Sequence, residues 1–99
     1  MVKSREEVMQ VLARNRVKIL GFGVRRLGLF GSFSRGENRA ASDLDFVVEF
    51  QTKSFDAYMD LKMHLEDIFD CHVDLVIPET IKPRLRSAIL KETVYAPGL

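Results

Sequence analysis

Cysteine, long apolar runs and repeated segments are scarce or absent in this sequence, and each shortage excludes a class of protein. Cys71 is the only cysteine of the 99 residues, so no internal disulfide can form and a reducing cytoplasm is the expected location. No apolar run approaches the roughly 20 residues of a membrane-spanning helix, and no apolar signal segment follows Met1. Low-complexity tracts and long linkers are also missing. We therefore expect a single domain over residues 1–99, with no membrane partner.

Charge is nearly balanced over the whole chain but unevenly distributed along it. The net charge of +1 argues neither for nor against a nucleic-acid partner. Residues 42–79 contain ten acidic and two basic residues, whereas residues 1–41 contain nine basic and three acidic residues. An acidic centre between basic flanks is compatible with a metal site among phosphate-attracting groups, and equally with solvated helix faces of different charge.

The apolar periodicity predicts a mixed α/β (α+β) fold with the element order α-β-β-α-β-α. Helices are marked by apolar residues at helical spacing after capping serines or a proline, and strands by alternating or continuous apolar runs. Residues 33–42 are polar and are predicted to form a loop. A small mixed sheet covered by helices follows from this order. The predicted elements are a helix from the cap Ser4 to Gly21, strands over 24–30, 43–50 and 73–77, a helix from the cap Ser54 to Ile68, and a basic helix from Pro83 to about Lys91.

Three aspartates interrupt the apolar pattern of the predicted strands. Asp43 and Asp45 share one face of their strand, with Cβ atoms roughly 6–7 Å apart. Asp74 lies inside the apolar strand 73–77, where a charge is costly unless it is paired or bound to a metal. Carboxylate oxygens suit Mg²⁺, and if the two strands are neighbours the three acids can hold one or two ions. Taken alone, the pattern is as typical of surface carboxylates as of a metal site.

The turn at Gly31-Ser32, just after the strand 24–30, adds a candidate phosphate-binding element. Glycine permits a close backbone approach, and free N–H groups with a serine hydroxyl can bind phosphate oxygens. Arg35 and Arg39 follow in the same loop and could pair with phosphate charge. A short connection then returns the chain to Asp43, so the phosphate-binding and metal-binding groups are expected at one edge of the sheet.

These motifs resemble those of a known family. Gly31-Ser32, ten intervening residues and then Asp43-x-Asp45 resemble the signature of the polymerase-beta-type nucleotidyltransferases, and of the minimal nucleotidyltransferases in particular. Val73-Asp74-Leu75-Val76 is similar to the strand that supplies the third carboxylate of that family. The resemblance covers nearly the whole chain. In sequence and length the chain is also similar to the antitoxin partners of HEPN ribonuclease toxins, which are prokaryotic.

The resemblance implies a function and a set of site residues. Asp43, Asp45 and Asp74 would be the catalytic metal ligands for Mg²⁺, with Asp74 also helping to deprotonate the acceptor hydroxyl. Gly31 and Ser32 would hold the triphosphate of the donor, ATP, and Arg35 would contact its phosphates. The acceptor would be a tyrosine hydroxyl of the cognate HEPN toxin. Nucleic acid is not the main partner that the resemblance implies, and a homo-oligomer stays open.

Other interpretations of the sequence remain open. The chain could neutralise a toxin by binding alone, or transfer a nucleotide to a small molecule or RNA, although such enzymes usually carry a further acceptor-binding domain. A zinc site is disfavoured because His64, Cys71 and His72 lack paired ligand spacing. Self-modification of Tyr58 or Tyr95 is less expected than an ordinary structural role for both residues.

Overall fold

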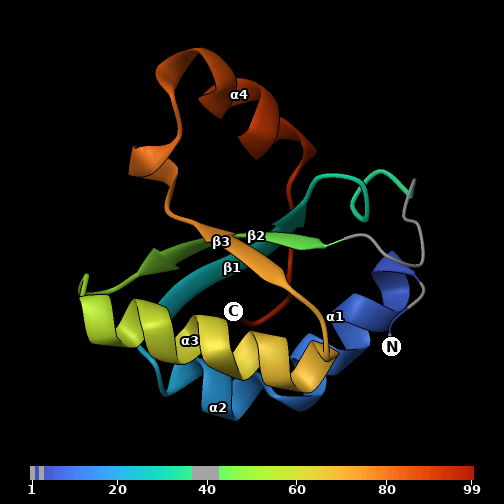
Figure 1. Ribbon diagram of the computed structural model, residues 1–99, viewed down its shortest axis with the longest axis vertical. Helices are drawn as coiled ribbons and strands as arrows, with labels where there is room; N and C mark the ends of the chain where they lie inside the picture. The colour runs from blue at the N-terminus through green and yellow to red at the C-terminus, as the bar shows by residue number, and fades with distance from the viewer. Residues whose placement is uncertain (1, 3, 37–42) are drawn as a thin grey trace.

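A four-stranded mixed sheet organises the chain in a computed structural model, which describes residues 2, 4–36 and 43–99. Three helices cover one face of the sheet and the last α-helix lies on the opposite side (Figure 1). The fold class expected from the sequence is therefore confirmed. Along the chain the elements are α1 (Arg5–Arg14), α2 (Arg16–Leu20), β1 (Val24–Phe30), β2 (Leu44–Phe50), α3 (Phe55–Phe69), β3 (Val73–Val76), the 3₁₀ helix η1 (Pro78–Thr80), α4 (Pro83–Glu92) and β4 (Val94–Tyr95).

The strand order across the sheet is β3-β2-β1-β4. β1 pairs antiparallel with β2 and with β4. β2 pairs parallel with β3, and helix α3 connects these two strands along the chain. The expected neighbourhood of the second and third strands is therefore present. β4 was not predicted from the sequence. It is only two residues long, and it forms by pairing with Gly28 and Leu29 far back in the chain.

Alternation along β2 separates the hydrophobic core from the opposite face of the sheet. Leu44, Phe46 and Val48 are fully buried against the helices, while Asp45 and Glu49 are half-buried on the other face. The core is completed by buried side chains from α1 and α3, including Leu12 and Leu65. The face that carries Asp45 is therefore the one directed toward α4 (Figure 1).

The helix starts follow the predicted caps, but the first predicted helix is divided. The Ser4 hydroxyl accepts the Glu7 N–H at 3.2 Å, and the Ser54 hydroxyl accepts the Ala57 N–H at 3.2 Å. The prediction of one continuous helix to Gly21 is wrong, because α1 ends at Arg14 and α2 begins after Asn15. The Asn15 side chain donates to the carbonyl of Val11 at 2.8 Å, and such local bonds compete with regular helix.

The C-terminal third leaves the sheet and then returns to it. Pro78 begins η1, and Pro83 occupies the first turn of α4 as expected. The Arg86 guanidinium donates to the carbonyls of Pro78 and Ile81 at 3.0 and 3.1 Å, which fixes α4 to the turn before it.

Among the described residues, no helix has the length and apolar character that crossing a bilayer requires. Of the predicted loop 33–42, only residues 33–36 are among the described residues. Arg39 lies outside them.

Candidate active site

Asp45 and Asp74 are direct neighbours on adjacent parallel strands. They occupy the same register position of β2 and β3, and Leu44 with Val73 forms the preceding pair. Their side chains point to the same face of the sheet because register partners share a face. Asp45 is half-buried, whereas the side chain of Asp74, on the edge strand, is 52% exposed. Two of the three acids named from the sequence are therefore brought together.

The environment of Asp45 is unfavourable for a free carboxylate. Burial raises its pKa to about 6 from an ordinary value of 3.8, and the negative charge of Asp74 and a hydrogen bond with it act in the same direction. Asp43 and Glu92 contribute further negative charge nearby. A divalent cation among these oxygens would remove the repulsion, and oxygen donors are the ligands that Mg²⁺ prefers. The donor set therefore fits a hard divalent cation.

Asp43 reaches the same place from the residue before β2. One ligand atom each of Asp43, His72 and Asp74 lies within 4.8 Å of the other two, and all three residues are exposed. The sequence pattern disfavours His72 as a zinc ligand and predicts only that it lies at the entry to the third strand. The structure places its Nε2 atom 3.1 Å from Asp74 Oδ1 and its Nδ1 atom 3.3 Å from Glu66 Oε2. This group of possible ligands contains Asp74 but not Asp45, and Asp74 is also the register partner of Asp45.

The turn at Gly31 lies directly against the side chain of Asp45. Gly31 has a φ of +78°, a conformation that glycine adopts without strain. A Cβ atom added at Gly31 would overlap the carboxylate of Asp45, so the absent side chain is what allows the two residues to lie together. The carbonyl of Gly31 accepts the Ser34 hydroxyl at 2.9 Å, which holds the turn closed, and Ser32 lies within this turn, half-buried. The expected meeting of the Gly-Ser turn with the aspartates is present.

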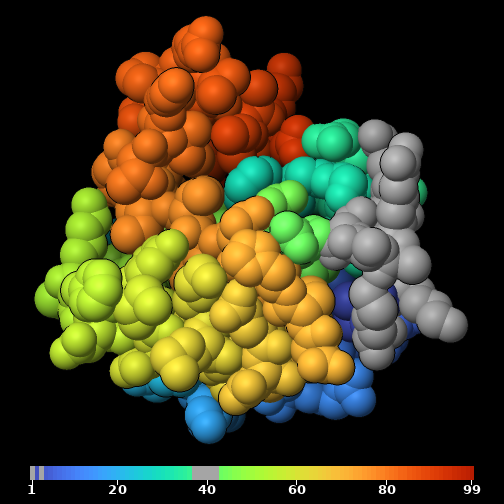
Figure 2. All heavy atoms as spheres, viewed as in Figure 1, coloured from blue at the N-terminus to red at the C-terminus, as the bar shows by residue number. Residues whose placement is uncertain are grey.

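Glu92, at the last position of α4, joins the site from a distant part of the chain. Its Oε2 atom accepts the Gly31 N–H at 2.7 Å, and both of its oxygens lie within 3.2 Å of Arg35 Nη1. Figure 2 shows the turn after β1 (teal) directly against the end of α4 (red). Sequence reasoning missed Glu92. It is 61 residues from Gly31 and belongs to a helix whose other charged residues are basic, so no local pattern indicates it.

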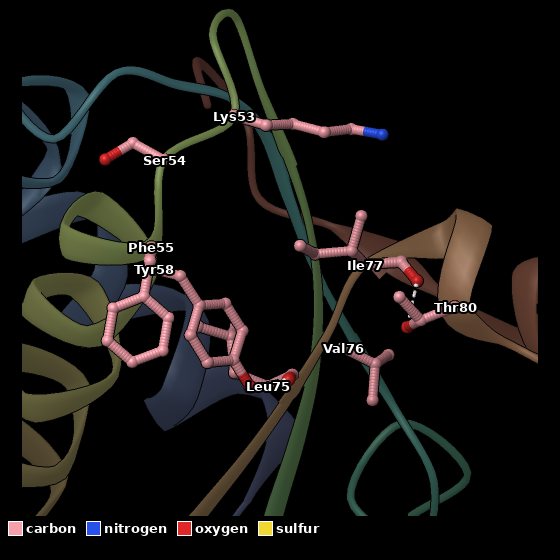
Figure 3. Close-up of a pocket in the computed structure, with 8 residues that line it drawn as sticks. All are labelled: Lys53, Ser54, Phe55, Tyr58, Leu75, Val76, Ile77 and Thr80. Carbon is pink, nitrogen blue, oxygen red and sulfur yellow. Dashed lines mark hydrogen bonds between the residues drawn. The ribbon is translucent and has the colours of Figure 1, made fainter.

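A separate hollow of about 440 Å³ lies at the edge of the sheet between the start of α3 and the region of β3 and η1 (Figure 3). Phe55, Tyr58 and Ile77 supply much of its lining, and Lys53 stands at its rim. The Tyr58 hydroxyl donates to the carbonyl of Leu75, so this tyrosine supports the edge strand. The lining includes none of the three aspartates, so the hollow is distinct from the acidic site.

A carboxylate cluster beside a glycine turn can hold a metal ion next to phosphate oxygens, as metal-assisted phosphoryl transfer requires. Residues 6–95 match the family described as polymerase beta, nucleotidyltransferase, and the chain belongs to this family. The matched range contains the Gly31 turn, all three aspartates and Glu92. The chain is therefore a nucleotidyltransferase, and the resemblance seen in its motifs is confirmed.

Individual relatives and solved structures are similar to most of the chain. The chain is 35% identical over 92 residues to the protein adenylyltransferase MntA of Thermococcus cleftensis, covering 91% of this chain and 93% of the relative. A solved structure assigned to a minimal nucleotidyltransferase superposes with a TM-score of 0.71 at 34% identity, over 87% of this chain and 93% of the other. A crystal structure of a toxin–antitoxin with AMP-PNP superposes with a TM-score of 0.68 at 26% identity, over 87% and 73%.

Proposed function

We propose that this chain transfers AMP from ATP, with Mg²⁺ as its metal, to a tyrosine hydroxyl of a cognate HEPN ribonuclease toxin, and so acts as an antitoxin in the prokaryotic cytoplasm. The observation that carries the proposal is the register pair of Asp45 and Asp74 beside the Gly31 turn. Two similarities support the choice of acceptor: the relative named protein adenylyltransferase, and the toxin–antitoxin structure with AMP-PNP.

The roles of the residues follow from their positions. Asp43, Asp45 and Asp74 would hold the divalent cation, which when bound neutralises charge on the attacking and leaving oxygens. The Gly31 N–H, the Ser32 hydroxyl and the Arg35 guanidinium would hold the triphosphate, since backbone amides and arginine bind phosphate oxygens well. Gly31 lies against Asp45, and its N–H and the Arg35 guanidinium bind the same Glu92 carboxylate, so the phosphates and the acids would meet at one place.

The proposed step is an in-line substitution at the α-phosphorus of ATP. The acceptor hydroxyl oxygen forms a bond to the α-phosphorus while the bond to the oxygen bridging to the β-phosphate breaks, and pyrophosphate leaves. The hydroxyl proton passes to the Asp74 carboxylate, as in general base catalysis. Asp74 suits this role because it is exposed on an edge strand, where a hydroxyl of another protein can approach. Asp45, half-buried under Gly31, is less accessible to such an acceptor.

The test is a transfer assay with the product of the neighbouring gene as acceptor. The purified chain, Mg²⁺, labelled ATP and that partner are incubated together, and mass addition on the partner is measured. We expect the wild-type protein to add AMP and the Asp45→Asn variant to add none, because the neutral amide removes one of the negative charges that would hold Mg²⁺. Co-purification of the variant with the partner reports whether the complex still forms.

A matched control separates catalysis from folding. Glu49 lies four residues along β2 on the same face as Asp45, and its side chain is 31% exposed in an ion pair with Arg26. The Glu49→Gln variant should transfer AMP at the wild-type rate. If Asp45→Asn protects cells from the partner as well as the wild-type protein does, neutralisation by binding alone replaces the catalytic proposal. Transfer to RNA or to a small molecule, with none to the partner, would overturn the proposed acceptor.

A further inference from the structure

Glu92 binds two groups that the proposed function assigns to phosphate, the Gly31 N–H and the Arg35 guanidinium. Its carboxylate accepts the Gly31 N–H at 2.7 Å, and it pairs with Arg35 at 3.0 Å. A short N–H bond to an anionic oxygen, together with a guanidinium, is the contact set that a phosphate oxygen would make at this turn. The Glu92 side chain is 29% exposed and that of Arg35 is 46% exposed, so the ion pair is open to solvent, whereas the bond from the Gly31 N–H is partly buried.

The position of Glu92 is otherwise electrostatically unfavourable. It is the last residue of α4, and a negative charge at a helix C-terminus lies against the helix dipole. It also lies close enough to Asp45 for the two negative charges to repel. The contacts with Gly31 and Arg35 offset these costs. A phosphate group of higher negative charge can compete for the same two donors.

We propose that Glu92 is an intramolecular stand-in for the triphosphate, which the incoming nucleotide displaces from Gly31 and Arg35. This inference rests on the proposed function, because it takes those two residues as the triphosphate site. The backbone around Glu92 is held, since Glu92 is the last residue of α4 and β4, paired with β1, follows after Thr93. Displacement therefore needs a rotation of the Glu92 side chain or a shift of the end of α4, and leaves the sheet intact.

The stand-in has two opposite energetic effects. Without nucleotide, Glu92 stabilises the turn by satisfying the Gly31 N–H and the Arg35 charge. With nucleotide present, the same contacts compete with the triphosphate and lower its apparent affinity, because only the fraction of molecules with Glu92 displaced can bind. Removing the Glu92 charge should therefore lower the stability of the nucleotide-free protein and raise its affinity for the nucleotide. A residue that simply supports the binding site would change both quantities in the same direction.

The experiment measures binding of AMP-PNP with Mg²⁺ by titration calorimetry, and the melting temperature of the nucleotide-free protein. For Glu92→Gln we expect a Kd about tenfold lower than that of the wild type, the size of one weakened charge-assisted contact. The melting temperature without nucleotide should fall. Glu49→Gln is the matched control, since Glu49 is equally exposed and ion-paired with Arg26 but makes none of the Gly31 contacts, and its Kd should equal that of the wild type.

Each outcome separates the inference from the proposed function. If the wild type binds AMP-PNP and Glu92→Gln binds it no more tightly, the stand-in is refuted while the nucleotide site is retained. If neither protein binds AMP-PNP, the proposed function fails and the inference fails with it. Should Glu92→Gln not fold, Glu92→Asp keeps the charge but is one methylene shorter, so the carboxylate cannot reach Gly31 as before. That variant should also bind more tightly than the wild type, and weaker binding would refute the stand-in.

Discussion

The Asp45 carboxylate lies in the space that a side chain at Gly31 would fill. A Cβ atom at Gly31 would overlap Oδ2 of Asp45, and the next nearest atoms are also those of Asp45. Gly31 also has a positive φ of 78°, a conformation that favours glycine. Both the backbone conformation and the contact with Asp45 therefore require glycine at this position. The relationship links the turn that is proposed to bind phosphate to the carboxylate that is proposed to bind metal. A side chain added at Gly31 should therefore displace the Asp45 carboxylate.

Gly31→Ala should abolish AMP transfer and also lower stability. The methyl group would push the Asp45 side chain out of position, and alanine at positive φ costs about 1 kcal/mol or more. The matched control is Gly23→Ala, because Gly23 has a similar φ of +84° but no atom within 4 Å of an added Cβ. That variant should lose about 1 kcal/mol in urea unfolding and keep its transfer activity. Equal activity losses in the two variants would show that backbone strain, rather than contact with Asp45, is responsible.

Asp45 should make the metal-free protein less stable as the pH rises from about 4 to 6. Its pKa is about 6 in the folded protein against an ordinary 3.8, so in this window the folded state retains a proton that the unfolded state has released. The contribution of Asp45 to the free energy of unfolding therefore falls with rising pH and levels off above pH 6. Because Asp45 is only half-buried, solvent screening limits the loss to about 1–2 kcal/mol.

The measurement compares the wild type with Asp45→Asn in thermal melts without divalent cations. At pH 8 the asparagine variant should be the more stable protein, and the difference should shrink toward zero as the pH falls to 4. Adding Mg²⁺ at pH 8 should raise the melting temperature of the wild type more than that of the variant, because a ligand stabilises the state that binds it. A difference between the two proteins that does not change between pH 4 and 8 would contradict the prediction.

Gly28→Ala should destabilise the fold through β4. Gly28 pairs with Tyr95, and a Cβ atom there would overlap Cγ2 of Thr93 and crowd the Tyr95 ring. Overpacking of this kind costs about 1–3 kcal/mol, measured as a lower urea midpoint. Thr93→Ser removes the Cγ2 methyl but keeps the hydroxyl that donates to Ile89. The double variant should therefore recover part of the loss, and strictly additive effects would show that Thr93 is not the obstacle.

The parts of this fold that could be predicted from the sequence are those with a local cause. The alternation around Phe46 predicts β2 and its buried face, and Ser54 predicts the start of α3. The convergence of Asp45 and Asp74 could be predicted because both charges interrupt apolar strands. The family resemblance predicted that the Gly31 turn and these aspartates belong to one site.

The parts that escaped prediction depend on contacts between distant segments. β4 has only two residues, too few for a strand pattern, and it forms because Gly28 leaves space beside β1. Glu92 is indistinguishable from a surface residue until α4 places it at Gly31. The helix break at Asn15 has a local cause, its bond to the carbonyl of Val11, but asparagine inside a helical pattern does not reveal whether its side chain will turn back on the backbone.

Tyr58→Phe should cost about 1 kcal/mol of stability and leave AMP transfer unchanged. The Tyr58 hydroxyl donates to the carbonyl of Leu75 on the edge strand β3, and phenylalanine would leave that carbonyl without its side-chain donor. Tyr95→Phe is the comparison, because the Tyr95 ring lies 3.8 Å from the Arg26 guanidinium and that contact does not need the hydroxyl. Urea unfolding and the intact mass after incubation with Mg²⁺ and ATP are measured for both. A wild-type mass gain of one AMP that either variant lacks would instead identify the missing hydroxyl as an acceptor.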